Sequence, residues 1–208
     1  MSRIAILDYG MGNLRSVEKA LERVGAEAVI SADPDVVRSA DGLVLPGVGA
    51  FAKAMERIGE LELDRLIAQR VEEQTPVLGI CLGYQLLFES STELGGAEGL
   101  GLVSGKVRGL AAPERKVPHI GWEPVEWQHS SDLVEGIASR TPFYFVHSFV
   151  SEKVGSDDVL GTAEHGERFV CAIARPPIYG VQFHPEKSSA AGLHLLGNFA
   201  DICAAVPA

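Results

Sequence analysis

The sequence contains few cysteines, and their spacing supports neither a disulfide framework nor a zinc site. Cys81, Cys171 and Cys203 are the only three among 208 residues, and an odd, widely spaced set does not form a disulfide scaffold. Neither a C-x-x-C nor an H-x-x-x-H pair occurs, so we expect no metal site. The pattern predicts three reduced thiols in a reducing compartment.

Long apolar runs and net positive charge are also missing. No stretch approaches the about 18 uninterrupted apolar residues that a membrane-spanning helix requires. The formal net charge of −10 argues against a nucleic-acid partner, since binding to phosphates needs a basic surface. The N-terminus, MSRIAILDYG, lacks a charged stretch, an apolar run and a cleavage site in succession, so we expect a mature, cytoplasmic protein without a membrane partner.

In the N-terminal part of the chain, apolar segments alternate with amphipathic ones. Strands are expected over residues 3–9, 26–31, 41–47 and 76–80, and helices over residues 12–25, 50–61 and 63–74. Strands that alternate with helices in this way predict a parallel, doubly wound sheet.

After residue 100 the pattern changes to strand-like segments joined by short turns. These segments are 100–110, 117–127, 141–152, 158–166, 167–175 and 178–183, and a final helix is expected over 189–205. No long linker, repeat or low-complexity tract interrupts them. We therefore expect an α/β fold in a single domain, residues 1–208, with a mostly parallel central sheet, flanking helices and an antiparallel β extension.

Cys81 lies between two glycines in the stretch GICLG, residues 79–83. This spacing matches the G-x-S-x-G turn, with cysteine in place of serine, in which a sharp strand-to-helix turn presents a nucleophile. We expect a helix over 84–90, whose N–H groups would favour the thiolate form of Cys81. A buried, inert cysteine in a glycine-flanked turn is the alternative at this point.

The apolar run over 178–183 ends in a histidine followed two residues later by a carboxylate, His184 and Glu186. Residues two apart in extended chain project to the same side, so both side chains can face one cavity. The carboxylate would fix the imidazole tautomer, and the imidazole would accept the thiol proton of Cys81. Otherwise His184 would only cap a strand, and Glu186 would form a solvated pair with Lys187.

The stretch LPGVGAF, residues 45–51, follows the third expected strand. Gly47 and Gly49 leave the backbone free to direct N–H groups inward, as an oxyanion hole requires, although an ordinary glycine-rich turn would look the same. Loops at the carboxyl ends of parallel strands share one crevice, so this loop and Cys81 are expected to be neighbours. A nucleophile, an oriented base and backbone donors are together the set that acyl transfer through a thioester needs.

The remaining motifs predict neither a cofactor site nor a metal site. The stretch GMGNLR, residues 10–15, begins as G-x-G but has Arg15 where the dinucleotide fingerprint needs glycine, so neither a nicotinamide nor a flavin cofactor is expected. The remaining histidines lack metal-ligand spacing, and three of them are predicted to be surface or structural residues: His129, His165 and His194.

The stretches GICLGYQ (79–85) and HPE (184–186) together resemble the class I, triad-type glutamine amidotransferase family. The pattern of expected strands and helices is compatible with this family over nearly the whole chain. The resemblance implies a flavodoxin-like fold. It also implies that Cys81 attacks the side-chain amide of glutamine, giving a glutamyl thioester and ammonia. His184 would act as base and then as acid, oriented by Glu186, and water would release glutamate. The resemblance implies no cofactor.

Other stretches resemble one branch of this family, the glutaminase subunits that serve a cyclase of histidine biosynthesis. They are LDYGMGNLRSV (7–17), PGVGAF (46–51), PHIGW (118–122), YFVHSF (144–149) and FHPEKS (183–188). The resemblance implies a heterodimer with a (β/α)₈-barrel cyclase that receives the ammonia through a channel. The products would be imidazole glycerol phosphate and aminoimidazole carboxamide ribotide.

The resemblance further implies roles for individual residues. The N–H groups of Gly49 and Leu82 would form the oxyanion hole. The residues that would hold glutamine or line its pocket are Gly47, Gln85, Glu93, His147 and Ser148. The residues that match positions near the partner are Asn13, Trp122, Tyr144 and Lys187. Two positions depart from the family pattern: Glu123 replaces the usual asparagine after PHIGW, and Phe149 replaces a common tyrosine.

Three other functions share some of these features. The glutaminase component of anthranilate or aminodeoxychorismate synthase would have the triad but should lack DYGMGN and PHIGW. A stand-alone cysteine hydrolase would use Cys81 and His184 on another amide, and would leave Gln85 and Glu93 without an amino acid to bind. A binding module with a structural or redox-sensing cysteine is the non-enzymatic alternative.

Overall fold

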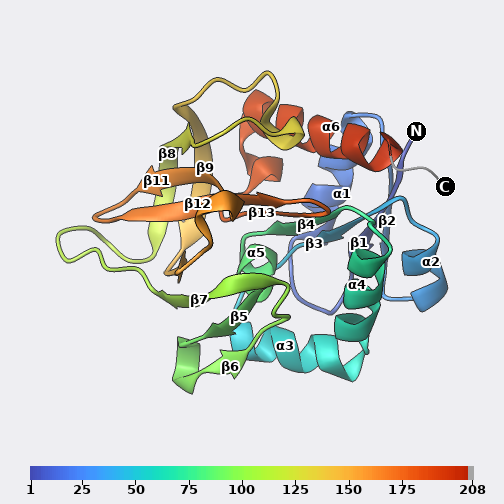
Figure 1. Ribbon diagram of the computed structural model, residues 1–208, viewed down its shortest axis with the longest axis horizontal. Helices are drawn as coiled ribbons and strands as arrows, with labels where there is room; N and C mark the ends of the chain where they lie inside the picture. Colours follow the sequence, from blue (N-terminus) through green and yellow to red (C-terminus); the bar gives the residue numbers. More distant parts are fainter. Residues whose placement is uncertain (206–208) are drawn as a thin grey trace.

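Within residues 1–205, which the computed structural model describes, 13 strands form one mixed sheet with helices on both faces (Figure 1). The last three residues of the predicted domain 1–208 lie outside the described residues. The helices are α1 (Leu14–Arg23), α2 (Pro34–Arg38), α3 (Phe51–Glu60), α4 (Leu63–Glu72), α5 (Leu82–Leu86) and α6 (Ser189–Ala205). The strands are β1 (Arg3–Leu7), β2 (Glu27–Ser31), β3 (Gly42–Leu45), β4 (Val77–Ile80), β5 (Phe88–Ser91), β6 (Ala97–Glu98), β7 (Val103–Gly109), β8 (His119–Trp127), β9 (Thr141–His147), β10 (Phe149–Glu152), β11 (Val159–Glu164), β12 (Arg168–Arg175) and β13 (Ile178–Val181).

Five neighbouring strands form the parallel centre of the sheet, in the order β2-β1-β3-β4-β13. Four of them come from the N-terminal part, as the alternation of strands and helices predicts. The fifth, β13, belongs by sequence to the antiparallel half, yet it pairs in parallel with β4, with Val181 opposite Ile80. A strand from the end of the chain therefore completes the centre of the sheet.

The remaining strands form the predicted antiparallel extension, with one exception. On the far side of β13 the order continues β12-β10-β7-β5-β6, while β11, β8 and β9 branch from β12. The β12–β10, β10–β7 and β8–β9 pairs are antiparallel, but β5 and β7 run parallel. The expected α/β fold, a mostly parallel central sheet with an antiparallel extension, is confirmed.

Helices α1 and α6 cover one face of the central sheet, and α3 and α4 cover the other (Figure 1). Each face has its own apolar cluster, with Leu21 and Phe199 in one and Phe51 and Ile67 in the other. All residues of β3 and β4 are buried, as expected of strands that are covered on both faces. No helix in the described part of the chain is long and apolar enough to cross a membrane.

The boundaries after Cys81 differ from the prediction. The expected helix over 84–90 is wrong beyond Leu86, where α5 ends. The chain continues as β5, because Phe88 pairs with Val103 of β7. The ring of Phe88 also packs edge-on against Tyr84, with ring centroids 5.1 Å apart. Sheet pairing and packing thus override a locally helical pattern.

The structure differs from the prediction at two further places. The predicted strand over 141–152 divides at Ser148, where the chain passes from β9, paired with β8, to β10, paired with β7. Helix α2 was not predicted, although its signals are present: Pro34 occupies the first turn, and the Asp33 carboxylate accepts the Asp35 N–H at 2.8 Å. Both are favoured residues at a helix start.

A glycine in α6 allows this helix to pack directly against the turn that carries the His-Pro-Glu stretch. A Cβ atom at Gly192 would lie 1.9 Å from the carbonyl oxygen of Pro185, a separation that no side chain tolerates. By contrast, a Cβ atom at Gly197 in the same helix would approach nothing closer than Val24, at 3.8 Å. Close packing at Gly192 therefore holds η4 (Pro185–Lys187) in place.

We expect Gly192→Ala to lower the free energy of unfolding by at least about 1–3 kcal/mol, the usual cost of overpacking. Gly197→Ala is the matched control, and should be neutral or stabilising by up to about 1 kcal/mol, because alanine has the higher helix propensity. Urea unfolding of both variants measures the difference. Equal stabilities would show that the contact at Gly192 is unimportant.

Candidate active site

The pairing of β4 with β13 brings the ends of two strands that are far apart in sequence to the same edge of the sheet. The Cys81 N–H donates to the Val181 carbonyl at 2.8 Å, which extends the β4–β13 ladder by one bond. Cys81 directly follows β4, and His184 is the third residue after the end of β13. The nucleophile and base candidates therefore lie at the carboxyl ends of adjacent parallel strands, where α/β sheets form their crevices.

The turn at Cys81 has the strained geometry that its glycine-flanked sequence predicts. Cys81 has φ of 55° and ψ of −106°, a conformation that a non-glycine residue adopts only when its surroundings enforce it. A Cβ atom at Gly79 would lie 2.8 Å from the Gly83 carbonyl oxygen, and one at Gly83 would lie 1.7 Å from the Leu45 carbonyl oxygen. Both glycines are needed because backbone segments cross at contact distance.

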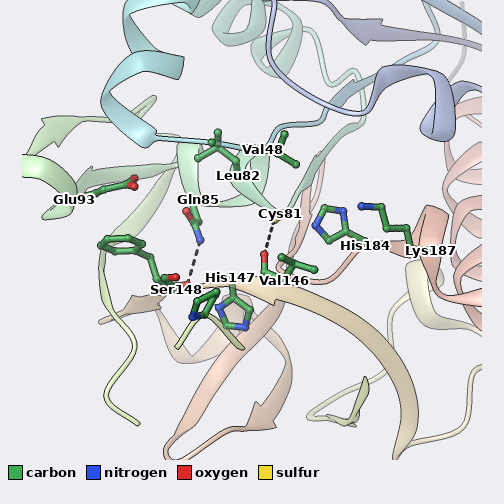
Figure 2. A pocket seen from close by; sticks show the side chains of 13 residues that line it. Val48, Cys81, Leu82, Gln85, Glu93, Val146, His147, Ser148, His184 and Lys187 are labelled. Carbon is green, nitrogen blue, oxygen red and sulfur yellow. Dashed lines mark hydrogen bonds between the residues drawn. The ribbon is translucent and has the colours of Figure 1, made fainter. Parts of the chain in front are cut away.

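The Cys81 sulfur lies between one acceptor and one donor, and only 6% of the residue is exposed. Its thiol donates to the Val146 carbonyl at 3.6 Å (Figure 2). On another side, the Gln182 side-chain amide donates to the sulfur at 3.9 Å. Gln182 was not predicted from the sequence, although its position two residues before His184, at the end of a strand, is a signal that the two share a side.

The orientation of the Gln182 amide follows from its neighbour Gln85. The Gln85 Nε2 donates to the Phe149 carbonyl at 3.2 Å, so this atom is the nitrogen. The same nitrogen donates to the Gln182 Oε1 at 3.0 Å. The Gln182 nitrogen must therefore face Cys81, where its N–H stabilises a thiolate.

His184 and Glu186 form a buried pair. The imidazole Nδ1 lies 2.8 Å from the Glu186 Oε1, and their side chains are 3% and 1% exposed. Since the carboxylate accepts, Nδ1 carries the proton. Burial lowers the pKa of His184, but the neighbouring Cys81 and Glu186 outweigh burial and raise it to about 9. The imidazole is therefore ready to hold a proton beside the sulfur.

Cys81 and His184 share the wall of a cavity of about 260 Å³ (Figure 2). This volume lies below the about 300–1,000 Å³ typical of pockets for drug-sized ligands, so it suits a molecule of amino-acid size. The cavity brings together most of the residues that the sequence assigned to glutamine binding and to the oxyanion hole. Its lining is Val48, Gly49, Cys81, Leu82, Gln85, Glu93, Pro118, Val146, His147, Ser148, Phe149, His184 and Lys187.

The polar lining residues are themselves held in place. One carboxylate oxygen of Glu93 accepts the Phe51 N–H at 2.8 Å, at the start of α3. The His147 ring is bonded at both nitrogens, to the Phe149 carbonyl at 2.9 Å and to the His119 Nδ1 at 3.0 Å. Burial lowers the pKa of His147 to about 4, so this histidine is neutral. It therefore contributes a ring face to the cavity and not a charge.

The loop expected to form the oxyanion hole is only partly at the cavity. Gly49, with φ of 107°, lines it, but Gly47 does not. Gly47 packs instead against Tyr9, whose hydroxyl oxygen would lie 2.2 Å from a Cβ atom at that position. The Leu82 N–H donates to the Gly47 carbonyl at 3.3 Å. In this arrangement the expected second oxyanion donor is already engaged.

Of the four residues expected near a partner, Asn13, Trp122 and Lys187 are exposed and Tyr144 is half-buried. Trp122 is 49% exposed, and its ring packs against Tyr144, with ring centroids 5.8 Å apart. Lys187 lies at the cavity itself (Figure 2). Asn13 is exposed and follows Gly12, where a Cβ atom would lie within 3.5 Å of the Cα atom of Gly47, so its loop borders the oxyanion loop.

The other cysteines and histidines occupy different environments. Cys171 and Cys203 are buried, and all three cysteines are free thiols in the described residues, as predicted. His129 and His194 are exposed, which confirms them as surface residues. His165 is 8% exposed and contacts His119 inside the β8–β11 region.

Comparison with known proteins gives a family and a group of relatives. The family model for class I glutamine amidotransferases matches residues 5–203. A HisH subunit of imidazole glycerol phosphate synthase from Moorella thermoacetica is 48% identical over 202 residues, which cover 97% of this chain and 96% of that protein. The subunit of the same name from Bacillus subtilis is 43% identical, with 97% of each chain covered.

Solved structures show the same fold at lower identity. The crystal structure of a glutamine amidotransferase has a TM-score of 0.74 at 21% identity, and the match covers 95% of this chain and 98% of that one. PurLQS from Thermotoga maritima has a TM-score of 0.77 at 17% identity, and the match covers 97% of this chain and 99% of that one. The chain therefore belongs to the class I glutamine amidotransferase family, in the branch formed by the HisH subunits of imidazole glycerol phosphate synthase.

Proposed function

We propose that Cys81, His184 and Glu186 are the catalytic triad with which this chain hydrolyses L-glutamine to glutamate and ammonia. The observation that carries the proposal is the buried His184–Glu186 pair, 2.8 Å apart, at the same cavity as the strained Cys81 turn. We take residues 1–208 to act as one glutaminase domain in the cytoplasm, and the proposed chemistry needs neither a metal nor a cofactor.

The reaction divides into two acyl transfers. The Cys81 thiolate attacks the side-chain amide carbon of glutamine, and a C–S bond replaces the C–N bond as ammonia leaves. His184, which has taken the thiol proton, returns it to the leaving nitrogen. Water then attacks the thioester, His184 accepts a proton from it, and glutamate leaves as the thiol is restored. Glu186 orients the imidazole and stabilises its charged form throughout.

An oxyanion hole requires a small movement in the loop before α3. The Leu82 N–H is bonded to the Gly47 carbonyl at 3.3 Å, and this bond must open before Leu82 can donate to a tetrahedral intermediate. Gly49 lines the cavity and would supply the second N–H. The isolated subunit is accordingly expected to have low glutaminase activity until this loop is rearranged.

The polar lining of the cavity would hold the amino-acid end of glutamine. Glu93 offers a carboxylate for the α-ammonium group, and the Gln85 Oε1 can accept from the same group because both N–H groups of Gln85 are engaged, while the Ser148 hydroxyl offers a donor for the α-carboxylate. The neutral His147 ring, bonded at both nitrogens, would shape the cavity wall. Gly47 would act indirectly, through the position of the oxyanion loop.

A partner subunit is needed because free ammonia in water at neutral pH is mostly protonated and is then no nucleophile. The relatives are subunits of imidazole glycerol phosphate synthase, so we propose a heterodimer with a (β/α)₈-barrel cyclase that accepts ammonia through a channel. The cyclase would make imidazole glycerol phosphate and aminoimidazole carboxamide ribotide from a phosphoribulosyl nucleotide. Asn13, Trp122, Tyr144 and Lys187 would lie at the contact, since Lys187 lines the cavity, Asn13 and Trp122 are exposed, and Tyr144 packs against Trp122.

We expect Cys81→Ala to abolish glutamine-dependent synthesis of imidazole glycerol phosphate by the mixed subunits, because the thioester cannot form. Synthesis with added ammonium salt should remain at the level of the unmodified complex, since the cyclase is untouched. Product formation with each nitrogen source measures both activities.

Cys203→Ala is the control for the loss of a buried thiol away from the cavity, and should retain both activities. Loss of the ammonium-dependent activity in Cys81→Ala would contradict transfer of ammonia to a separate site.

The raised pKa of His184 should depend on both of its neighbours. Cys81→Ala and Glu186→Gln each remove a group that stabilises the imidazolium, so in each variant the pKa should fall below about 9. The pH dependence of the His184 ring resonances in NMR spectra measures it, and the exposed His194 is the internal control. A pKa that stays the same in both variants would contradict the pairing.

The same pair predicts a pH dependence of stability. Because folding raises the pKa of His184 from 6.5 to about 9, the folded state holds the extra proton between these values. The resulting stabilisation is fully present below pH 6.5 and is lost as the pH rises through about 9. In Glu186→Gln the loss should occur at lower pH, as measured by urea unfolding from pH 6 to about 10. An identical pH profile would exclude the carboxylate as the cause.

Gln182 is proposed as a positioning residue that favours the Cys81 thiolate by donating to the sulfur. Gln182→Leu removes this donor at similar volume, so the rate of Cys81 alkylation should shift to higher pH. Gln182→Glu should shift it further, because a carboxylate repels a thiolate. Alkylation by iodoacetamide across pH measures the shift. Changes in stability without any change in this profile would leave Gln182 with a packing role only.

A further inference from the structure

Three acceptor groups from distant parts of the sequence meet on the β8–β11 side of the molecule. His119 and Glu123 are four residues apart on β8, so they project from the same face of the strand. His165 lies in the turn between β11 and β12, and its ring stacks on His119 with ring centroids 3.9 Å apart. Sequence spacing gave no sign of this cluster because 42 residues separate Glu123 from His165.

The tautomer of His119 follows from its bonds to a neighbouring histidine. The His147 Nδ1 faces the Phe149 carbonyl at 2.9 Å and must donate to it. The neutral His147 therefore accepts at Nε2, where the His119 Nδ1 lies 3.0 Å away. The His119 Nδ1 is thus the donor, and its Nε2 carries a lone pair.

The tautomer of His165 follows in the same way. Its Nε2 lies 3.0 Å from the carbonyl oxygen of Lys116 and donates to it. In the neutral ring, the Nδ1 of His165 then carries a lone pair. Each histidine has one ring nitrogen anchored by a hydrogen bond to a fixed acceptor, which is the usual arrangement of histidines that bind a metal with their other nitrogen.

Both of these nitrogens lie near the same carboxylate. The Glu123 Oε1 lies 3.8 Å from the His119 Nε2 and 3.7 Å from the His165 Nδ1. Neither nitrogen has a hydrogen-bond partner anywhere in the described part of the chain, and the two residues are 1% and 8% exposed. Buried acceptors left without a donor are costly, so this cluster of three acceptors calls for a cation among them.

We propose that the His119 Nε2, the His165 Nδ1 and the Glu123 carboxylate bind one divalent transition-metal ion of the Zn²⁺ type. These ligand atoms all lie within 4.8 Å of one another. Two imidazoles and one carboxylate form a common three-residue zinc set, with a fourth position open for water or another ligand. The site is separate from the proposed glutaminase chemistry and does not depend on it.

Binding requires a modest closure of the cluster. Tetrahedral ligands about 2.1 Å from a zinc ion lie about 3.4 Å apart, so the carboxylate oxygen has to approach each nitrogen by a few tenths of an ångström. The two rings, now 18° from parallel, also have to splay, because a metal ion lies in the plane of each imidazole that binds it. Movement of His165 provides this, since the ring is carried by a turn and not by a strand.

A competing cation lies at the edge of the cluster. The Arg115 Nη1 is 3.9 Å from the Glu123 Oε1, beyond hydrogen-bond distance, and the Arg115 side chain is 57% exposed. Metal binding would displace this guanidinium toward solvent. Variants of Arg115 and Glu123 should therefore change the metal affinity in opposite directions. Removal of Arg115 should strengthen metal binding, and loss of Glu123 should weaken it.

The site would also contact the proposed glutamine cavity through one hydrogen bond. A metal ion on the His119 Nε2 makes its Nδ1–H a stronger donor to His147, which lines the cavity. The ion would thereby fix β8, the β11–β12 turn and the cavity wall relative to one another. Its presence should raise thermal stability by mass action.

The test is a metal titration of untagged, chelator-treated protein carrying Cys81→Ala, so that the thiol and His184 do not take up metal. Titration with Co²⁺ should give the visible absorption of a tetrahedral ion, and competition with a chromophoric chelator should give one Zn²⁺ per chain. The melting temperature should rise on addition of Zn²⁺. Binding only at excess metal, or with the spectrum of hydrated Co²⁺, would overturn the proposal.

Variants in the same background assign the ligands. Glu123→Gln preserves side-chain size, and it should weaken Zn²⁺ binding by at least about tenfold and abolish the rise in melting temperature. Arg115→Gln should tighten binding several-fold. Glu126 is a neighbouring carboxylate that pairs with Arg140 and Arg168. Its substitution, Glu126→Gln, should leave binding unchanged.

Equal Zn²⁺ affinity in the Glu123→Gln and Glu126→Gln proteins would overturn the site even if metal binds elsewhere. A charged imidazolium at His119 or His165 near neutral pH, seen by NMR in protein that takes up no Zn²⁺, would show that a proton serves as the cation instead and would also overturn it. Since Glu123→Gln alters no buried volume, the comparison remains decisive if a His165 variant fails to fold.

Discussion

The parallel pairing of β4 with β13 is the constraint on which the rest of the site depends. The ladder sets Val181 opposite Ile80, and the Cys81 N–H continues it by donating to Val181 at 2.8 Å. With that register fixed, the turn at Cys81 and the His184–Glu186 turn can only leave the sheet side by side. A one-residue slip would reverse the facing of each side chain beyond β13, so the register determines whether a thiol meets an imidazole.

The surrounding elements serve to keep these two turns in place. Leu45 of β3 approaches Gly83 so closely that a side chain is excluded at that position, which forces the strained backbone at Cys81. On the other face of the sheet, α6 presses Gly192 against Pro185 and supports the turn that carries Glu186. The site is thus assembled from backbone contacts at glycines, with buried amides such as Gln182 setting the polarity around the sulfur.

The sequence predicted the parts of the molecule that depend on local spacing. We could predict Cys81 between its glycines, and His184 two residues before Glu186, because the turn and the strand end require those intervals. It did not predict that β13 joins the parallel centre, or that α5 ends after Leu86, since both follow from pairing with distant strands. For the same reason the cluster of His119, Glu123 and His165 was not predicted, since its members meet only in the folded chain.

Labelling of the folded subunit with a glutamine-like diazo ketone, followed by peptide mass spectrometry, tests the central claim most directly. The reagent must be recognised in the cavity as an amino acid and then attacked by an activated sulfur. We expect one adduct per chain, on Cys81, that is prevented by excess glutamine and absent in His184→Ala. An adduct distributed over Cys81, Cys171 and Cys203, or one that glutamine does not prevent, would contradict it.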